Sequence, residues 1–385
     1  MTQPCGVAEY GGPGSDPKLQ LMGAICQLRD STLPAQGRDA VQARKYLPAL
    51  DGMRALSVLA VITVHMHQQV WNGANGILGV IVFFALSGYL ISSLALAEEK
   101  QTGRLDLPAF YIRRAFRILP LYYIVLGAYC VVIFGFPLGH SYASAMRRAL
   151  PYYLTYMQDV PYTLVNGQTS VPLYQTWSLG VEEKFYLLWP LLAFVLAPKF
   201  RAAIGITLFL LCAGFAFRHS AVGDMVTMSS AIPAGCVVAI AAARFSFNKL
   251  RLLWIPLTIT LLTFHMLVMP RHPSTVLFVA YAALTSVLIG VLADSRTLLH
   301  QVLESKPLVW VGRVSYGIYL IHMLCVRVAE RISSNALGAY VITCLLSVAV
   351  ASFLYLVIER PLIGLGRRIA HARASLRVPL SVVSA

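Results

Sequence analysis

Arg54 and His65 lie eleven positions apart, the first at the start of an apolar segment and the second within it. On an α-helix, eleven steps of ~100° return to nearly the same face, and a rise of ~1.5 Å per residue separates the two backbones by roughly 16 Å. We therefore expect Arg54 to reach the cytoplasmic interface of the membrane while His65 points into the helix bundle or an outward cavity. Histidine suits removal of a hydroxyl proton because its ordinary pKa is about 6.5, but near a helix end it can also simply bond a carbonyl. The spacing alone leaves both interpretations open.

A pair of arginines, Arg114 and Arg117, lies one helical turn apart in the segment FYIRRAFRILPLYY. Two guanidinium groups at this spacing can bind phosphate oxygens in a bidentate manner. They can also anchor a helix end at the lipid headgroups. The local sequence by itself favours the anchor.

The segment TWSLGVEEKFYLLWP contains Trp177, Ser178, Glu182 and Glu183, which we place at the outer mouth of the fourth predicted span. Ser178 and Glu182 would be neighbours on a continuous helix. A carboxylate at this position could orient an imidazole or bind sugar hydroxyls. It could equally cap the helix as an ion pair with Lys184.

A second histidine within an apolar run, His322, follows the segment VGRVSYGIYLI. Ser315, Tyr319 and His322 are spaced at i, i+4 and i+7, so they share one helix face. This spacing favours a face that lines a site, with Tyr319 and His322 as candidate substrate-binding residues.

Two further motifs are expected to be structural. Ser87 and Gly88 are small residues in a bulky apolar segment, which favours close helix packing. Ser87 is a poor candidate nucleophile because no general base lies near it in the sequence. Glu359, Arg360 and Pro361 are interpreted as a helix-ending ion pair.

The composition places these residues in a membrane. Of the 385 residues, 58% are apolar and only 12% are charged, about half the charged fraction of a soluble domain. Seven cysteines are scattered without a metal-ligand spacing, so no metal site is predicted. We predict an all-α, polytopic bundle of about ten transmembrane helices, since a span needs roughly 20 apolar residues. The predicted spans are residues 55–71, 77–97, 118–136, 183–197, 202–217, 226–243, 252–269, 274–293, 309–330 and 336–358.

The basic residues predict the orientation of these spans. An even number of spans puts both termini on one side, and a cytoplasmic N-terminus puts 24 of the 31 lysines and arginines inside. The other seven are Arg147, Arg148, Lys184, Arg218, Arg271, Arg327 and Arg331. The positive-inside rule therefore predicts that both termini are cytoplasmic. Basic residues at the ends of apolar runs also argue against nucleic-acid binding, which needs a basic soluble face.

The chain is predicted to contain one membrane domain with two tails. Residues 1–45 form a flexible cytoplasmic tail without assigned chemistry, residues 46–362 the membrane domain, and residues 363–385 a basic cytoplasmic tail. The longest outer connection, residues 137–182, is rich in aromatic residues and proline. Its rings could stack on sugars or form an aromatic belt at the membrane interface.

The chain resembles the acyltransferase-3 family of integral membrane acyltransferases in six segments and in their order. These segments are LDGMRALSVLAVITVH, GVIVFFALSGYLI, FYIRRAFRILPLYY, TWSLGVEEKFYLLWP, VGRVSYGIYLIH and ERP, across roughly residues 46–362. The family includes O-antigen, exopolysaccharide and nodulation-factor acetylases and some antibiotic acylases. The resemblance implies a bacterial inner-membrane enzyme that uses acyl-CoA as a co-substrate and holds no permanent cofactor.

The resemblance also implies roles for individual residues. The family's Arg-x10-His element falls on Arg54 and His65, which implies that His65 acts in acyl transfer. Its Arg-x-x-Arg element falls on Arg114 and Arg117 and implies binding of the CoA donor from the cytoplasm. Its Trp-Ser-Leu-x-x-Glu segment carries over to Trp177, Ser178 and Glu182, with Trp177 and Ser178 expected to bind the substrate.

The expected mechanism starts with acetyl-CoA, whose phosphates are neutralised by Arg54, Arg114 and Arg117. His65 then either removes the proton of a carbohydrate hydroxyl or carries the acyl group itself, while Glu182 tunes the imidazole. The acceptor, the choice of acetyl or another acyl group, and the oligomeric state stay open, with lipopolysaccharide, exopolysaccharide, a lipo-oligosaccharide and a macrolide as candidate acceptors.

A transporter or flippase is the alternative from another functional class. A helix bundle with histidine and glutamate in its spans could relay protons. Transporters usually contain paired repeats or matched broken helices, and the sequence contains neither. A structural or sensory membrane protein is a weaker alternative, in which His65 would tolerate replacement.

Overall fold

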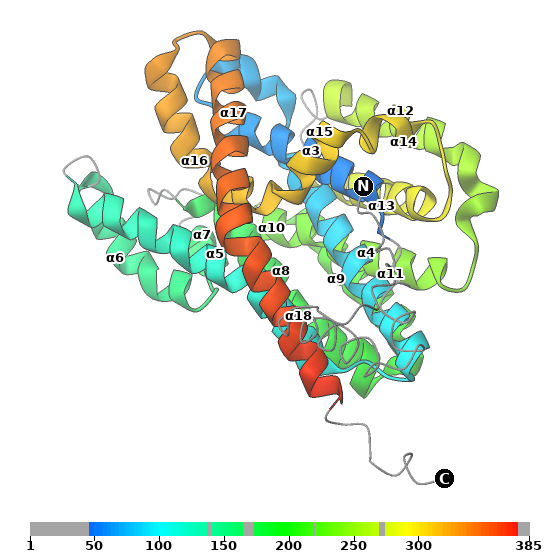
Figure 1. Ribbon diagram of the computed structural model, residues 1–385. Helices are drawn as coiled ribbons and strands as arrows, with labels where there is room; N and C mark the ends of the chain where they lie inside the picture. Colours follow the sequence, from blue (N-terminus) through cyan, green and yellow to red (C-terminus); the bar gives the residue numbers. More distant parts are fainter. Residues whose placement is uncertain (1–45, 137–139, 165–172, 219, 269–273, 376–385) are drawn as a thin grey trace, which may run out of the picture. The chain divides into compact units, whose positions relative to one another are not determined.

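The computed structural model describes residues 46–136, 140–164, 173–218, 220–268 and 274–375. Within these ranges the chain forms helices and no strands, as predicted. Residues 1–45, the predicted N-terminal tail, lie outside the described part of the chain. The helices of residues 47–385 belong to one compact unit (Figure 1).

The centre of this unit is the helix pair α4 (Ile77–Thr102) and α11 (Ala231–Ala242), which packs with α13 (Thr275–Asp294). A Cβ on Gly88 of α4 would lie 1.9 Å from a carbonyl oxygen of α11, and a Cβ on Gly235 of α11 would lie 2.1 Å from one of α4. The two backbones are therefore in direct contact, which only glycine permits at these positions. The predicted packing role of Gly88 is confirmed.

The helix that carries the Arg54–His65 element is α3 (Pro48–Val64). It begins with proline at the first helical turn and packs on α15 (Lys306–Arg313), where a Cβ on Gly312 would lie 1.8 Å from a carbonyl oxygen of α3. His65 is the C-cap residue, and its N–H bonds back to the last turn. The predicted span 55–71 therefore ends earlier than expected, and His65 lies at the helix end.

The second histidine lies on α16 (Ser315–Ile332), which follows α15 after a bend of 78°. The next helix, α17 (Ala336–Leu354), continues through a π-helical turn (Tyr355–Glu359) into α18 (Arg360–Ser375) (Figure 1). The prediction that the helix ends at Pro361 is wrong. Pro361 is the second residue of α18, just after the π turn that ends at Glu359, where the regular backbone hydrogen bonds are already interrupted.

Helix α18 packs against α5 (Leu107–Gly135). A Cβ on Gly366 would lie only 2.5 Å from the side chain of Phe116 on α5. The described part of the predicted tail 363–385 is thus a docked helix up to residue 375. The basic residues of its described part, Arg367, Arg368 and Arg373, therefore belong to this docked helix.

The predicted outer connection, residues 137–182, is largely helical where the structure describes it. It contains α6 (His140–Leu154), α7 (Asp159–Leu164) and a 3-10 turn (Tyr174–Thr176) before α8 (Trp177–Pro190). Gln175 and Thr176 of that turn are 1% and 0% exposed. The end of this segment therefore lies inside the helix bundle, and the prediction of an external loop is wrong for it.

The remaining helices complete the bundle around these elements. They are α9 (Arg201–Gly214), α10 (Ala221–Ser229), α12 (Trp254–Thr263) and α14 (Leu299–Leu303), with a π turn (Leu191–Leu196) after α8 and another (Phe264–Val268) after α12.

The ten predicted spans are not confirmed by the lengths and compositions of the described helices. Six are long and apolar enough to cross a membrane: Ile77–Thr102, Leu107–Gly135, Pro198–Phe217, Val222–Ala242, Thr275–Asp294 and Ala336–Arg373. The bent pair α15 and α16 raises the number to seven if it forms one span. Helix α3 has only 17 residues, α12 and its π turn have 10 and 5, and α8 carries consecutive charges at 182–184. The chain is a multi-pass membrane protein, and the side on which its termini lie stays a prediction from the charge pattern.

Candidate active site

The two histidines meet in the interior of the bundle. Nε2 of His322 lies 3.1 Å from Nδ1 of His65, and the ring centroids are 4.9 Å apart. His322 is completely buried, while His65 is half-buried at the end of α3. Packing of α16 on α3 produces this contact. The sequence identified both residues separately and did not predict the pair.

The imidazole of His322 is also bonded to its own helix. Its Nδ1 lies 2.8 Å from the carbonyl oxygen of Tyr319 and 3.2 Å from that of Ile318. Nδ1 of His65 likewise lies 3.1 Å from the carbonyl oxygen of Val61. Both rings are therefore held at defined orientations by the last turns that precede them.

Tyr319 and Ser178 connect α16 to the start of α8. The Tyr319 hydroxyl donates to the carbonyl oxygen of Gln175, and its oxygen lies 2.7 Å from the Ser178 hydroxyl. Trp177 is buried and its ring packs edge-on against Phe84 of α4, with centroids 6.0 Å apart. These predicted substrate-binding residues thus form part of the bundle interior near the histidines.

Two neighbours complete the surroundings of His65. The ring of Tyr174 lies 5.6 Å from the His65 ring, centroid to centroid. His67 is exposed, and its Nδ1 lies 2.8 Å from a carboxylate oxygen of Glu330. His67 is therefore a nearby histidine outside the buried pair.

Glu182 lies against α4 and not against the imidazole. Its carboxylate accepts a hydrogen bond of 2.8 Å from the hydroxyl of Ser87 and interacts electrostatically with Arg114 and Arg54. The structure therefore does not bring Glu182 to His65. The expected positions of Arg54 at the inner side and Glu182 at the outer mouth are incompatible, since the two groups lie at one level of the bundle.

The three predicted donor-binding arginines are brought together from α3 and α5. Arg117 interacts electrostatically with Arg54, with Arg114 and with the buried carboxylate of Glu359. The guanidinium of Arg114 lies 3.8 Å above the ring centroid of Tyr186. Among the described residues, no carboxylate lies within ion-pair distance of Arg114 or Arg117. We call Arg54, Arg114 and Arg117 the arginine cluster.

Three members of this region were missed or misjudged from the sequence. Ser87 was assigned to packing, but it is also the partner of Glu182. Glu359 was assigned to a helix end, although a carboxylate at the end of a long apolar run is a reason to expect a site. Tyr186 gave no signal of its own, because one aromatic residue in an apolar helix is ordinary.

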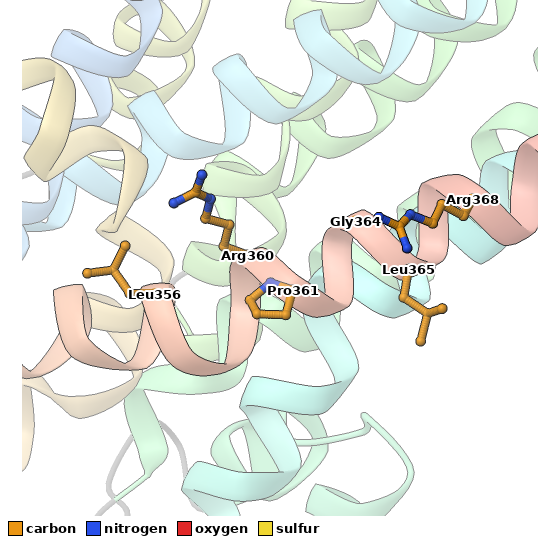
Figure 2. A pocket seen from close by; sticks show the side chains of 6 residues that line it. All are labelled: Leu356, Arg360, Pro361, Gly364, Leu365 and Arg368. Atoms are coloured by element: carbon orange, nitrogen blue, oxygen red, sulfur yellow. The ribbon is translucent and has the colours of Figure 1, made fainter. Parts of the chain in front are cut away.

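A groove of about 520 Å³ lies near the C-terminal end of the described chain, along the π turn after α17 and helix α18. Figure 2 shows its lining, with Arg360 and Leu365 projecting from different sides of the helix. It is lined by Leu356, Arg360, Pro361, Gly364, Leu365 and Arg368. None of the predicted site residues lines it.

Comparison with known proteins gives a consistent result. A family model described as an acyltransferase domain matches residues 47–356. The chain is 30% identical to the putative peptidoglycan O-acetyltransferase YrhL of Bacillus subtilis, over 83% of this chain and 55% of that protein. It is 32% identical to the peptidoglycan O-acetyltransferase OatA of Listeria monocytogenes, over 73% and 49%, and 31% identical to the O-acetyltransferase OatA of Staphylococcus aureus, over 83% and 57%. The chain thus spans about half the length of these relatives. No solved structure is significantly similar to it.

Proposed function

Because the chain belongs to the acyltransferase-3 family of membrane acyltransferases, we propose that it transfers an acetyl group from acetyl-CoA to a carbohydrate hydroxyl. The observation that carries this proposal is the pairing of two histidines at one end of α3 with an arginine cluster toward the other end. Eleven residues of helix separate Arg54 from His65, or roughly 16 Å along the axis. This distance suits a long donor whose phosphates and thioester lie far apart.

The arginine cluster supports an anionic donor. Like charges repel, and guanidinium groups in a helix bundle are costly unless an anion neutralises them. Asp51 pairs with Arg54 at 3.4 Å, and the carboxylates of Glu182, Glu183 and Glu359 lie nearby, but none of the four forms an ion pair with Arg114 or Arg117 within the described residues. Phosphate groups of CoA could accept bidentate bonds from these two guanidinium groups. The excess of basic residues in this part of the chain supports entry of the donor from the cytoplasm.

His65 is the proposed catalytic residue. Its Nε2 takes the proton of the acceptor hydroxyl as the hydroxyl oxygen attacks the thioester carbonyl, and the same proton then protonates the departing CoA thiolate. In a route through an acyl-histidine, the same nitrogen would attack the carbonyl instead. Radiolabel retained on the protein in the absence of acceptor would identify the second route.

The acceptor is proposed to bind near the histidines. The ring of Tyr319 lies 5.8 Å from that of His322, Ser178 is bonded to Tyr319, and Trp177 precedes Ser178, so these residues can supply an aromatic surface and hydroxyl groups for a sugar. Two of the relatives are named as peptidoglycan O-acetyltransferases, so peptidoglycan is the first acceptor to test. Lipopolysaccharide and exopolysaccharide are the next.

The proposed function is tested by acetyl transfer in membranes that contain the wild-type chain, the His65→Ala variant or the His67→Ala variant. Radiolabelled acetyl-CoA is the donor, and peptidoglycan fragments or a glycan extract serve as acceptors. We expect labelled glycan with the wild type and with His67→Ala, because His67 is paired with Glu330 away from the buried histidines. We expect none with His65→Ala. Transfer that survives in His65→Ala would contradict the assignment, and failure of the wild type with every donor and acceptor would favour a transporter.

A further inference from the structure

The hydrogen bonds around the two histidines determine where their protons lie. Nδ1 of His322 faces two carbonyl oxygens, those of Tyr319 and Ile318, and carbonyls only accept hydrogen bonds. Nδ1 of His322 must therefore carry a proton. Because His322 is 0% exposed, a charged imidazole would be costly there and the neutral form is expected. A neutral imidazole has one N–H, so Nε2 of His322 is an acceptor.

This assignment determines the tautomer of His65. The acceptor nitrogen of His322 lies 3.1 Å from Nδ1 of His65, which also faces the carbonyl oxygen of Val61 at 3.1 Å. Both partners of this nitrogen accept, so Nδ1 of His65 carries its proton. The lone pair of His65 is then on Nε2. No described residue forms a hydrogen bond to that nitrogen.

We propose that His322 is a positioning residue that holds His65 in the Nδ1–H tautomer and directs Nε2 toward the substrates. This inference rests on the proposed acetyl transfer and changes the predicted role of His322 from substrate binding to support of the catalytic imidazole. The arrangement follows the same logic as a catalytic triad, in which a third group orients the base. Here the third group is a neutral imidazole in place of a carboxylate.

The chemistry balances with this assignment. The hydroxyl proton moves to Nε2 of His65, and the Nδ1–H of the resulting imidazolium remains bonded to Nε2 of His322. Carbon–oxygen bond formation and carbon–sulfur bond cleavage release CoA as a thiolate, which takes the proton back from Nε2. His65 returns to its starting tautomer, and His322 gains and loses no proton.

Glu182 is less suitable for this role. Its carboxylate is bonded to Ser87 and interacts with the arginine cluster. Both partners of Nδ1 of His65 are already identified, and neither is Glu182. The direct neighbour, His322, is therefore the residue that can select the tautomer.

The test uses two amide variants of His322 that differ by one methylene group. In His322→Gln, the amide oxygen is three bonds from Cβ, as Nε2 is in histidine, so it can accept from His65. In His322→Asn the amide oxygen is two bonds from Cβ, as Nδ1 is, so it cannot reach His65. A third variant, His322→Phe, fills the space without an acceptor. Acetyl transfer kinetics with acetyl-CoA and a fixed acceptor give kcat and both KM values.

We expect His322→Gln to keep kcat within about tenfold of the wild type, and His322→Asn and His322→Phe to lose roughly a hundredfold or more, with both KM values within about threefold. Equal kcat in the Gln and Asn variants would overturn the proposal. An increase in the acceptor KM with unchanged kcat would also overturn it and restore the substrate-binding role. If His322→Phe does not fold, the Gln and Asn variants still decide. Absence of transfer by the wild type in the same assay would refute the proposed function instead.

Discussion

Replacement of Arg117 by glutamine removes one charge from the arginine cluster while keeping a polar, though shorter, side chain. Arg117 lies on α5 beside Arg54 and Arg114, and no described carboxylate lies within ion-pair distance of it. Its guanidinium is therefore available to a ligand. The variant removes no ion pair of the described structure, so we expect the fold to tolerate it.

The size of the effect follows from the bond that would be lost. A hydrogen bond to a charged group contributes about 1.5–3 kcal/mol, and about 1.4 kcal/mol corresponds to a factor of ten. Loss of one guanidinium–phosphate contact should thus raise the KM for acetyl-CoA about ten- to a hundredfold. The kcat should change little, because the thioester reacts at His65, roughly 16 Å away along α3.

The assay compares two donors and a matched control. Acetyl-pantetheine lacks the nucleotide phosphates, so its KM should change by less than about threefold in Arg117→Gln. Arg113→Gln removes the same charge four residues earlier on α5, where the guanidinium is bonded to Glu98 at 2.6 Å. This control should leave the KM for acetyl-CoA within about threefold of the wild type, since Arg113 is already paired with Glu98 and is not a member of the arginine cluster.

Two results would refute the reasoning. An unchanged KM for acetyl-CoA in Arg117→Gln would mean that the arginine cluster does not bind the donor phosphates. An equal rise for acetyl-CoA and acetyl-pantetheine would mean that Arg117 acts on something other than phosphate, such as the shape of the bundle.

Two further substitutions test the packing of the bundle and the role of its central carboxylate. Gly88→Ala should lower the thermal unfolding temperature of the detergent-purified protein by several degrees, because overpacking costs roughly 1–3 kcal/mol and its Cβ would lie 1.9 Å from a carbonyl oxygen of α11. Gly127→Ala, with nothing within 4 Å of its Cβ, should lower it little or not at all. Glu182→Gln should lower the KM for acetyl-CoA by making the surroundings of Arg54 and Arg114 more positive, with kcat nearly unchanged. A large loss of kcat in that variant would instead support the catalytic role expected for Glu182 from the sequence.

The sequence predicted those features that depend on short-range periodicity. The membrane class and the helical structure follow from the apolar runs. The position of Arg54 and His65 on one helix, about three turns apart, follows from their spacing, and so does the one-turn separation of Arg114 and Arg117. These features depend on the geometry of a single helix and need no knowledge of its neighbours.

The number and ends of the spans were less predictable. Hydropathy measures how apolar a segment is, but not where its helix stops or bends. The early end of α3, the bend of 78° before α16 and the helix that continues past Pro361 all depend on contacts with other helices. Pro361 does not end that helix, because the π turn before it already interrupts the regular backbone hydrogen bonds that a proline would otherwise break.

The site itself was decided by the tertiary structure. His65 and His322 are 257 residues apart, and Ser87 and Glu182 are 95 apart, so no local pattern could pair them. From the sequence Glu182 was a reasonable partner for the imidazole, but packing of α8 on α4 directs it to Ser87, and packing of α16 on α3 brings His322 instead. The sequence determined which residues could do chemistry and which helix faces carry them. Which faces meet was decided by the packing of whole helices, because that depends on steric fit over many residues that no single motif contains.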